Sequence, residues 1–387
     1  MKIMSERKII IFIFAAFAVI LTAVLLFSGI SSGEIKDEII LKDTEFTALI
    51  DDLRAHSSYD IELHYEEEQF GGCAAPYIHP GLQITVDSAS PEQQLYDHIR
   101  ENKEDIAEKL REKYPVDEIQ LYYFPYCWFT FDLTDSTWRN EITFQYNYNN
   151  DKKQPISGQF RGIVSMTAGG DGFADISELK CFPDVTDIIL PYYPYADKEY
   201  PPVNEDTEIK TIKSASVAFD NKNAFEFLRY FTNMDELDIT GSSDVPKIKI
   251  GGELPQVKKL RFIDCDNFDL GDLEYFPNLE QLDIVYSDLQ YDAQKKYSFP
   301  QVKTITLQSG SCEGGRVYEV YFDVDILEYF PELEKFCVYG TGTQPVAGEE
   351  NNYRDTRKIK EHLPEGCTYE RIDYFTVNDD EEDGENE

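Results

Sequence analysis

The 387-residue chain lacks closely spaced cysteines. Its seven cysteines are scattered and include no C-x-x-C pair, which argues against a zinc site and against a thioredoxin-like redox motif. The count is odd, and the chain is long enough to bury a core without covalent staples. We therefore expect most cysteines to be small buried apolar residues. The alternative, if the chain lies outside the cytoplasm, is that four or fewer of them form one or two disulfides.

Basic residues are also scarce. The 36 Lys and Arg face 74 Asp and Glu, which gives a net charge of −38. A field of that sign repels nucleic acid and anionic lipid surfaces, so we expect no nucleic-acid partner. Such a charge suits a soluble domain outside the cell membrane, and the alternative is weak attraction of cations or basic partners.

The usual motifs of catalysis and metal binding are missing as well. None of the five histidines lies in H-E-x-x-H or beside a cysteine nucleophile motif, and neither G-x-S-x-G nor a P-loop occurs. Asp264 begins a segment similar to a calcium loop, but Asp269 replaces the required Gly and Tyr275 the required Glu. We therefore expect no catalytic residue, no metal ligand and no cofactor.

One long apolar segment, residues 9–30, carries no charge. As a helix rising about 1.5 Å per residue it would be about 33 Å long, enough to cross the hydrocarbon core. Basic residues precede it and acidic residues follow it, so we expect a cytoplasmic tail over 1–8, a transmembrane helix over 9–30 and an extracytoplasmic remainder. A cleaved signal peptide is the alternative, because the small residues 31–33 follow directly.

Beyond this segment, an apolar motif recurs at a nearly constant interval. The first apolar residue of each expected strand marks the series Val185, Ile209, Met234, Val257, Leu279, Val302 and Leu333. The steps are 24, 25, 23, 22, 23 and 31 residues, and Phe160 with Ile163 adds one earlier copy. Internal periodicity of this length is typical of stacked repeats.

The clearest copy of the motif follows the pattern L-x-x-L-x-L-x-x-N/C-x-L. It consists of Leu279, Leu282, Ile284, Ser287 and Leu289, with Ser in the Asn position, and the preceding copy includes Val257, Leu260 and Cys265. The pattern resembles the leucine-rich repeat family. This resemblance covers residues 156–375 and implies an α/β solenoid of parallel strands. The Asn position elsewhere holds Ser242, Gly310 or Thr341, so we expect irregular repeats.

The second half of each repeat carries apolar residues three apart, as in Leu270, Leu273 and Phe276. This spacing predicts a helical turn or short helix, which Pro277 then ends.

The residues between the apolar strand positions carry charge that alternates from strand to strand. Arg261 is expected between Asp238 and Asp283, and Lys258 between Asp235 and Glu280. Since neighbouring strands lie about 4.8 Å apart, this alternation favours one stacking register by penalising like charges. The alternative is a charged patch that binds a ligand on the concave side, which is the usual binding side of the resembled family.

Aromatic residues in the loops form a second candidate surface for a partner. They are Tyr192, Tyr193, Tyr195, Tyr286, Tyr291, Tyr318 and Tyr321. Tyrosine is favoured at interfaces, although ordinary packing explains the same residues.

The segments on either side of the repeats do not repeat. Residues 34–150 are expected to form an α+β unit that caps the first repeat or stands as an independent domain. Its helix is expected to start at Ser90, with the side chain of Gln93 returning to the cap, and to run to about Tyr114. Residues 378–387 form an acidic tail that we expect to be disordered.

Together these patterns predict a non-catalytic, single-pass membrane protein that binds a protein or peptide through a leucine-rich-repeat solenoid. One alternative is a module that binds glycans or the cell wall through Trp128 and Trp138 in the N-terminal unit. The other is a hydrolase whose site lies within residues 34–150.

Overall fold

The structure is a computed structural model, and it describes most of the chain between residues 39 and 373. The described residues are 39–41, 43–71, 76–88, 90–111, 113–123, 127–134, 140–144, 156–168, 176–190, 208–218, 225, 227–241, 252–265, 268–287, 289–308, 310–311, 317–318, 323–340 and 356–373. The predicted transmembrane helix over 9–30 and the acidic tail over 378–387 lie outside them. Among the described residues, no helix combines the length and apolar character needed to cross a membrane.

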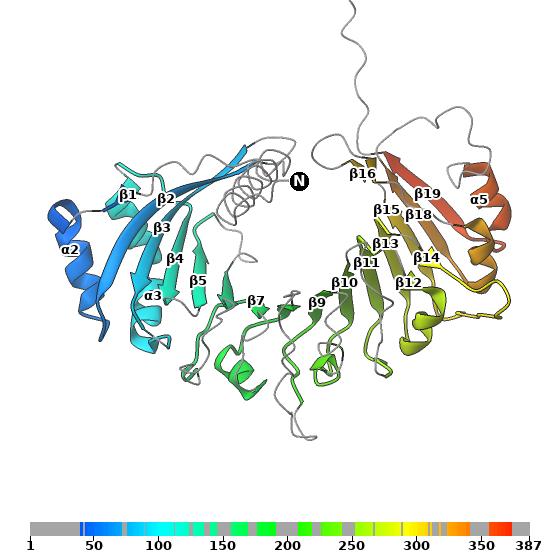
Figure 1. The fold of residues 1–387 in the computed structure, drawn as a ribbon, viewed down its shortest axis with the longest axis horizontal. Coiled ribbons are helices and arrows are strands. Elements are labelled where there is room, and N and C mark those ends of the chain that lie inside the picture. Colours follow the sequence, from blue (N-terminus) through cyan, green and yellow to red (C-terminus); the bar gives the residue numbers. More distant parts are fainter. Residues whose placement is uncertain are drawn as a thin grey trace, which may run out of the picture.

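One curved sheet of 15 strands runs through the described chain (Figure 1). In spatial order its strands are β1 (Ile39–Ile40), β2 (Ile61–Gly71), β3 (Pro76–Val86), β4 (Glu118–Tyr123), β5 (Cys127–Asp132), β6 (Glu141–Phe144), β7 (Ser165–Ala168), β8 (Asp187–Leu190), β9 (Ser214–Ala218), β10 (Glu236–Thr240), β11 (Lys259–Ile263), β13 (Gln281–Val285), β15 (Thr304–Gln308), β18 (Lys335–Gly340) and β19 (Thr368–Asp373). From β6 onward every pairing in this sheet is parallel.

The repeated motif explains the parallel part of the sheet. Each repeat contributes one strand with two buried positions, such as Leu260 and Phe262 in β11, which pair with Leu282 and Ile284 in β13. Buried and accessible positions alternate from β8 to β11 and again in β15, so these strands leave one face to solvent, whereas in β13 all positions from Leu282 to Val285 are buried. Strand β6 pairs with β7, so the N-terminal unit continues the same sheet.

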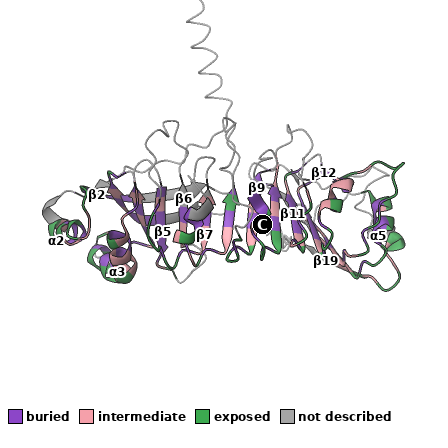
Figure 2. Cartoon of the chain, turned by 90° about the horizontal axis from the view of Figure 1, so that it is seen from below, coloured by how far each residue is buried: buried purple, intermediate pink, exposed green. Residues whose placement is uncertain are grey.

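Helices cover the outer side of the arc, and the strands line its inner side (Figure 1). The helices are α2 (Asp43–Arg54), α3 (Gln93–Arg111) and α5 (Thr356–His362). The predicted helical turns of the repeats are 3-10 helices, η3 (Ile176–Cys181), η4 (Leu270–Tyr275) and η5 (Val324–Tyr329). Figure 2 shows buried and exposed residues on the same helices, as expected for elements that cover a core from outside.

One long step of the repeat series has a local cause. Between Val302 and Leu333 the chain inserts the small antiparallel pair β16 (Gly310–Ser311) and β17 (Val317–Tyr318). Strands β15 and β18 still pair directly in register, from Thr304 with Lys335 to Gln308 with Tyr339. The extra residues therefore leave the sheet without changing its order. A further short parallel pair joins β12 (Phe268–Asp269) to β14 (Leu289–Gln290).

The position expected to hold a buried Asn keeps a similar role in two repeats. The Ser287 hydroxyl accepts a hydrogen bond from the Cys265 amide at 2.8 Å and donates one to the Val285 carbonyl at 2.7 Å. Cys265 Sγ in turn contacts the Ile239 carbonyl at 3.4 Å. Short side chains thus link neighbouring repeats where the resembled family uses Asn.

Three sequence-based assignments were wrong. Phe160 is not the marker of its repeat, because Ile163 precedes β7 as Val185 precedes β8. Ile209 does not begin a strand, because it forms only a single bridge with Phe231, and β9 begins at Ser214. The residue equivalent to Met234 is Ile212, since Ala215 pairs with Leu237. The Gln93 side chain does not return to Ser90, because it bonds to Asp97 and to the backbone of Gln159.

Candidate functional site

The solvent-facing side of the parallel strands carries two rows of polar residues. The first, which we call the outer row, consists of Lys213, Asp235, Lys258, Glu280, Lys303 and Glu334. Consecutive members are joined by backbone hydrogen bonds from one strand to the next, so each is a direct neighbour of the last. Charge alternates along the whole row, as in the pair of Lys258 and Glu280 with Nζ and Oε1 3.3 Å apart.

The second row, the central row, consists of Ser216, Asp238, Arg261, Asp283, Thr306, Cys337 and Glu370, and of these Asp283 and Cys337 are buried. The prediction that Arg261 lies between two acids is confirmed: its guanidinium is 3.2 Å from Asp238 Oδ2 and 3.9 Å from Asp283 Oδ2. Burial raises the pKa of the Asp238 carboxyl more than the Arg261 charge lowers it. Toward the other end, a hydrogen bond from Lys335 lowers the pKa of Glu370. We refer to both rows together as the polar face.

The predicted core residues of the repeats all lie in the interior. Val185, Ile209, Met234, Val257, Leu260, Leu279, Leu282, Val302 and Leu333 are each at most 9% exposed. They hold the strands in place and are not available to a ligand.

The predicted tyrosine surface is described only in part. Tyr192, Tyr193, Tyr195 and Tyr321 lie outside the described residues, and for Tyr318 only the backbone, in β17, is described. Tyr286 and Tyr291 are half-buried. The Tyr291 hydroxyl donates to Asp323 Oδ2 at 2.6 Å, which raises its pKa, and its ring packs 6.0 Å from that of Tyr329. Tyr291 is therefore engaged in local contacts, whereas Tyr286 adopts a left-handed backbone conformation at φ 49° directly after β13.

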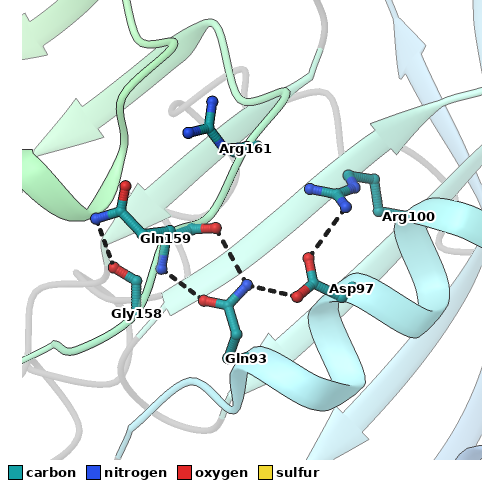
Figure 3. Close-up of a pocket in the computed structure, with 6 residues that line it drawn as sticks. All are labelled: Gln93, Asp97, Arg100, Gly158, Gln159 and Arg161. Atoms are coloured by element: carbon teal, nitrogen blue, oxygen red, sulfur yellow. Dashed lines mark hydrogen bonds and ion pairs between the residues drawn. The ribbon is translucent and has the colours of Figure 1, made fainter.

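A separate open hollow of about 530 Å³ lies where helix α3 meets the first repeat (Figure 3). Its lining consists of Gln93, Asp97, Arg100, Gly158, Gln159 and Arg161. Gln93 Oε1 accepts from the Gln159 amide at 2.6 Å, and Gln93 Nε2 donates to the Gln159 carbonyl at 3.1 Å. The Gln93 side chain thus bonds to both backbone polar groups of Gln159, as a paired β-strand residue would.

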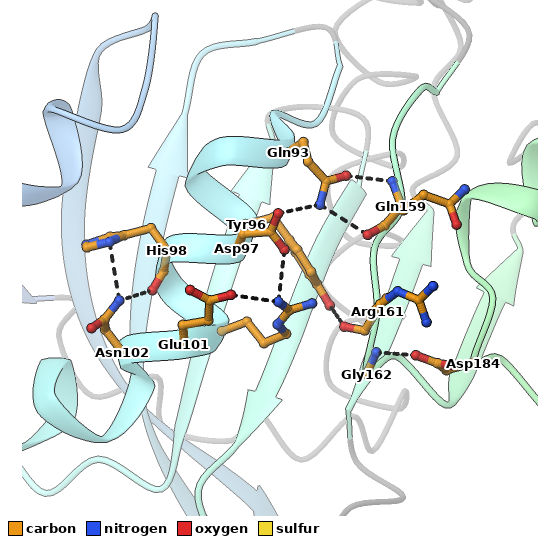
Figure 4. Close-up of polar contacts among 11 residues, drawn as sticks. Gln93, Tyr96, Asp97, His98, Glu101, Asn102, Gln159, Arg161, Gly162 and Asp184 are labelled. Atoms are coloured by element: carbon orange, nitrogen blue, oxygen red, sulfur yellow. Dashed lines mark hydrogen bonds and ion pairs between the residues drawn. The ribbon is translucent and has the colours of Figure 1, made fainter.

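Further contacts attach the same helix to the first repeat (Figure 4). The Tyr96 hydroxyl donates to the Arg161 carbonyl at 2.5 Å, and its burial raises the pKa of the phenol. Arg100 pairs with Asp97 at 3.2 Å and with Glu101 at 3.0 Å. Gln93 and Gln159 therefore serve the joint between α3 and the repeats, whereas Arg100 pairs within α3, and the exposed Arg161 guanidinium pairs with none of the described residues.

The sequence gives no sign of this joint, because Gln93 and Gln159 are 66 residues apart and belong to no motif. Only the placement of α3 against the repeats brings them together. The hollow offers amide, carboxylate and guanidinium groups, which can hold a polar ligand.

The chain matches no protein-family model, no curated protein and no solved structure.

Proposed function

We propose that this protein is a membrane-anchored, extracytoplasmic binding protein of leucine-rich-repeat type, which receives a protein or peptide on its polar face and catalyses no reaction. The observation that carries the proposal is the unbroken parallel register from β6 to β19. It produces a broad surface on the inner side of the arc, on which side chains of both signs stand about 4.8 Å apart. A surface of this kind suits an extended polypeptide contact better than a small enclosed substrate.

The mixed charge of the polar face indicates the character of the partner. The outer row alternates in sign, so it has little net field of its own although the chain carries −38. Opposite charges at a fixed spacing favour a partner with complementary alternation and disfavour one of uniform charge. We therefore infer selectivity for a polypeptide of mixed charge.

Site-specific photo-crosslinking on the full-length protein in its native membrane tests this proposal. A photoreactive residue at Thr306, in the central row, should capture a protein or peptide, because this position faces the inner side of the arc. The matched control is Glu274 in η4, an exposed position on the outer side. Equal capture at both positions, or capture at Glu274 alone, would contradict binding on the polar face.

The anchor is tested independently by washing membranes in alkaline carbonate. We expect the full-length protein to stay in the membrane pellet, because residues 9–30 form an uninterrupted apolar segment. Release into the wash, or a mature chain that begins near Glu34, would show a cleaved signal peptide instead.

A further inference from the structure

A cluster of metal-binding side chains lies between helices α2 and α3, away from the polar face. Asp52 belongs to α2, His56 to the turn that follows it, and His98 to α3. One ligand atom from each, a carboxylate oxygen and two imidazole nitrogens, lies within 4.8 Å of the others. Figure 4 shows His98 and Asn102 on the side of α3 opposite the hollow.

The hydrogen bonds of His56 leave one of its ring nitrogens available. Nδ1 lies 2.8 Å from the Asp52 carbonyl oxygen, which can only accept, so Nδ1 carries the proton. The Nε2 lone pair is then free to bind a cation. A backbone carbonyl that fixes the tautomer in this way is the usual second partner of a metal-bound histidine.

His98 is held by its own helix. The side chain of Asn102 donates to the His98 carbonyl at 2.8 Å and lies 3.3 Å from His98 Nδ1. Asn102 also departs from helical geometry, at φ −117° and ψ 15°, so α3 is kinked one turn after His98. The helix therefore aims His98 toward Asp52, and its side chain is only 14% exposed.

The separation of His98 and Asp52 suits two ligands of one ion. His98 Nε2 and Asp52 Oδ2 are 3.3 Å apart, which is about the separation of two ligands bound tetrahedrally at about 2.0–2.1 Å. The rings of His56 and His98 are stacked with centroids 3.7 Å apart and planes at 8°. Coordination by both Nε2 atoms requires the His56 ring, which lies in a turn, to tilt.

We propose that Asp52, His56 and His98 form a binding site for a divalent transition-metal ion of the zinc class. Two imidazoles and one carboxylate select such ions over calcium or magnesium, which prefer oxygen ligands alone. The ion takes the place of the proton between His98 Nε2 and Asp52 Oδ2. The neutral His98 ring then carries its proton on Nδ1 instead of Nε2, and the Asn102 amide, whose nitrogen now lies 3.3 Å from Nδ1, has to rotate so that its oxygen accepts that proton. Three protein ligands leave one position for water or for a group of a partner.

Lys109 is the competing cation at this site. Its Nζ lies 3.7 Å from Asp52 Oδ2, and its side chain is half exposed, so it can withdraw when an ion binds. Removal of this positive charge should therefore strengthen binding of the metal, whereas removal of a ligand should weaken it.

Calorimetric titration of Zn²⁺ into the full-length chain, purified in detergent and stripped with a chelator, tests the site. We expect one ion per chain, an affinity about 100-fold lower in His98→Ala and in His56→Ala, and a higher affinity in Lys109→Met. The matched control is His362→Ala, which removes a histidine that also lies beside a carboxylate, 3.6 Å from Asp325, but has no second imidazole. It should bind Zn²⁺ as the unchanged chain does.

Absorption of bound Co²⁺ provides a second measurement, because its visible bands report coordination by nitrogen and oxygen ligands directly. Unchanged Zn²⁺ affinity in His98→Ala, or no binding by the unchanged chain at micromolar Zn²⁺, would overturn the proposal. If His98→Ala fails to fold, Lys109→Met still decides, since a lower or equal affinity in that variant contradicts the site.

Discussion

At the scale of single residues, Gly158 is a position that only glycine fits. Its φ is 128°, and a methyl group there would overlap Gln93 Oε1. The overlap would break the amide contact between α3 and the first repeat. We expect Gly158→Ala to lower the free energy of unfolding by about 1–3 kcal/mol, measured by urea denaturation.

Gly366 supplies the matched control for that substitution. It also has a positive φ, 86°, but a methyl group there would meet no atom within 4 Å. Gly366→Ala should therefore cost only the backbone strain, about 1 kcal/mol. Equal losses in the two variants would show that the contact with Gln93 contributes nothing.

Two acids of the central row should respond to pH in opposite directions. Burial raises the pKa of Asp238 in the folded chain, so its contribution to stability is present below its unfolded pKa and is lost as pH rises through the folded pKa. The Lys335 hydrogen bond lowers the pKa of Glu370, whose contribution is present above its unfolded pKa and is lost as pH falls through the folded pKa.

Urea denaturation between about pH 3 and 7 tests both signs against the unchanged chain. Relative to Asp238→Asn, the unchanged chain should lose stability as pH rises over this range. Relative to Glu370→Gln, it should gain stability. The two stability differences should therefore change with pH in opposite directions, because the two pKa shifts are opposite in sign. A change in the same direction for both would contradict the assigned causes.

At the scale of the strands, the charge of Arg261 stabilises the register in which β10, β11 and β13 pair. Arg261→Glu would place three acids side by side across β10, β11 and β13. We expect a loss of about 1–3 kcal/mol in unfolding free energy, and a smaller loss in the neutral control Arg261→Met. The double variant Asp238→Lys with Arg261→Glu should recover part of the loss, and no recovery would mean that charge does not act across this pair.

The strands and their register could be predicted because the repeat specifies both at once. The spacing between Val257, Leu279 and Val302 fixes which strands are neighbours, and the apolar alternation fixes which face is buried. The prediction failed at Ile209 because Ile209 and Ile212 are both apolar and three residues apart, and the copy has no Phe-Pro to fix the frame. The same ambiguity applies to Phe160 and Ile163, which are also three residues apart, and the structure shows that Ile163 precedes β7 as Val185 precedes β8.

The joint at Gln93 and the cluster at His98 could not be predicted from the sequence. Each depends on how α3 lies against another element, which no local pattern specifies. In the sequence, Asn102 is a weak indication of a kink, because an Asn side chain within a helix can bond to a backbone carbonyl of the preceding turn. Its contact with His98 becomes visible only in the folded helix.

At the scale of the whole molecule, each repeat contacts mainly its two neighbours, as in other stacked folds. Deletion of residues 257–278 removes one full repeat and should leave β10 able to pair with β13 in the same register. The deletion also changes the charge pattern, because it places Asp238 beside Asp283. We therefore expect a folded but destabilised chain.

A single substitution separates this charge effect from the loss of core. In the intact chain, Asp283→Arg places a second guanidinium beside Arg261 and should lower stability. In the deleted chain the same substitution places Arg beside Asp238 and should raise stability, because opposite charges again face each other. Thermal unfolding of the four chains measures both effects. If Asp283→Arg shifts the melting temperature in the same direction with and without the deletion, the alternating charge does not specify the stacking order.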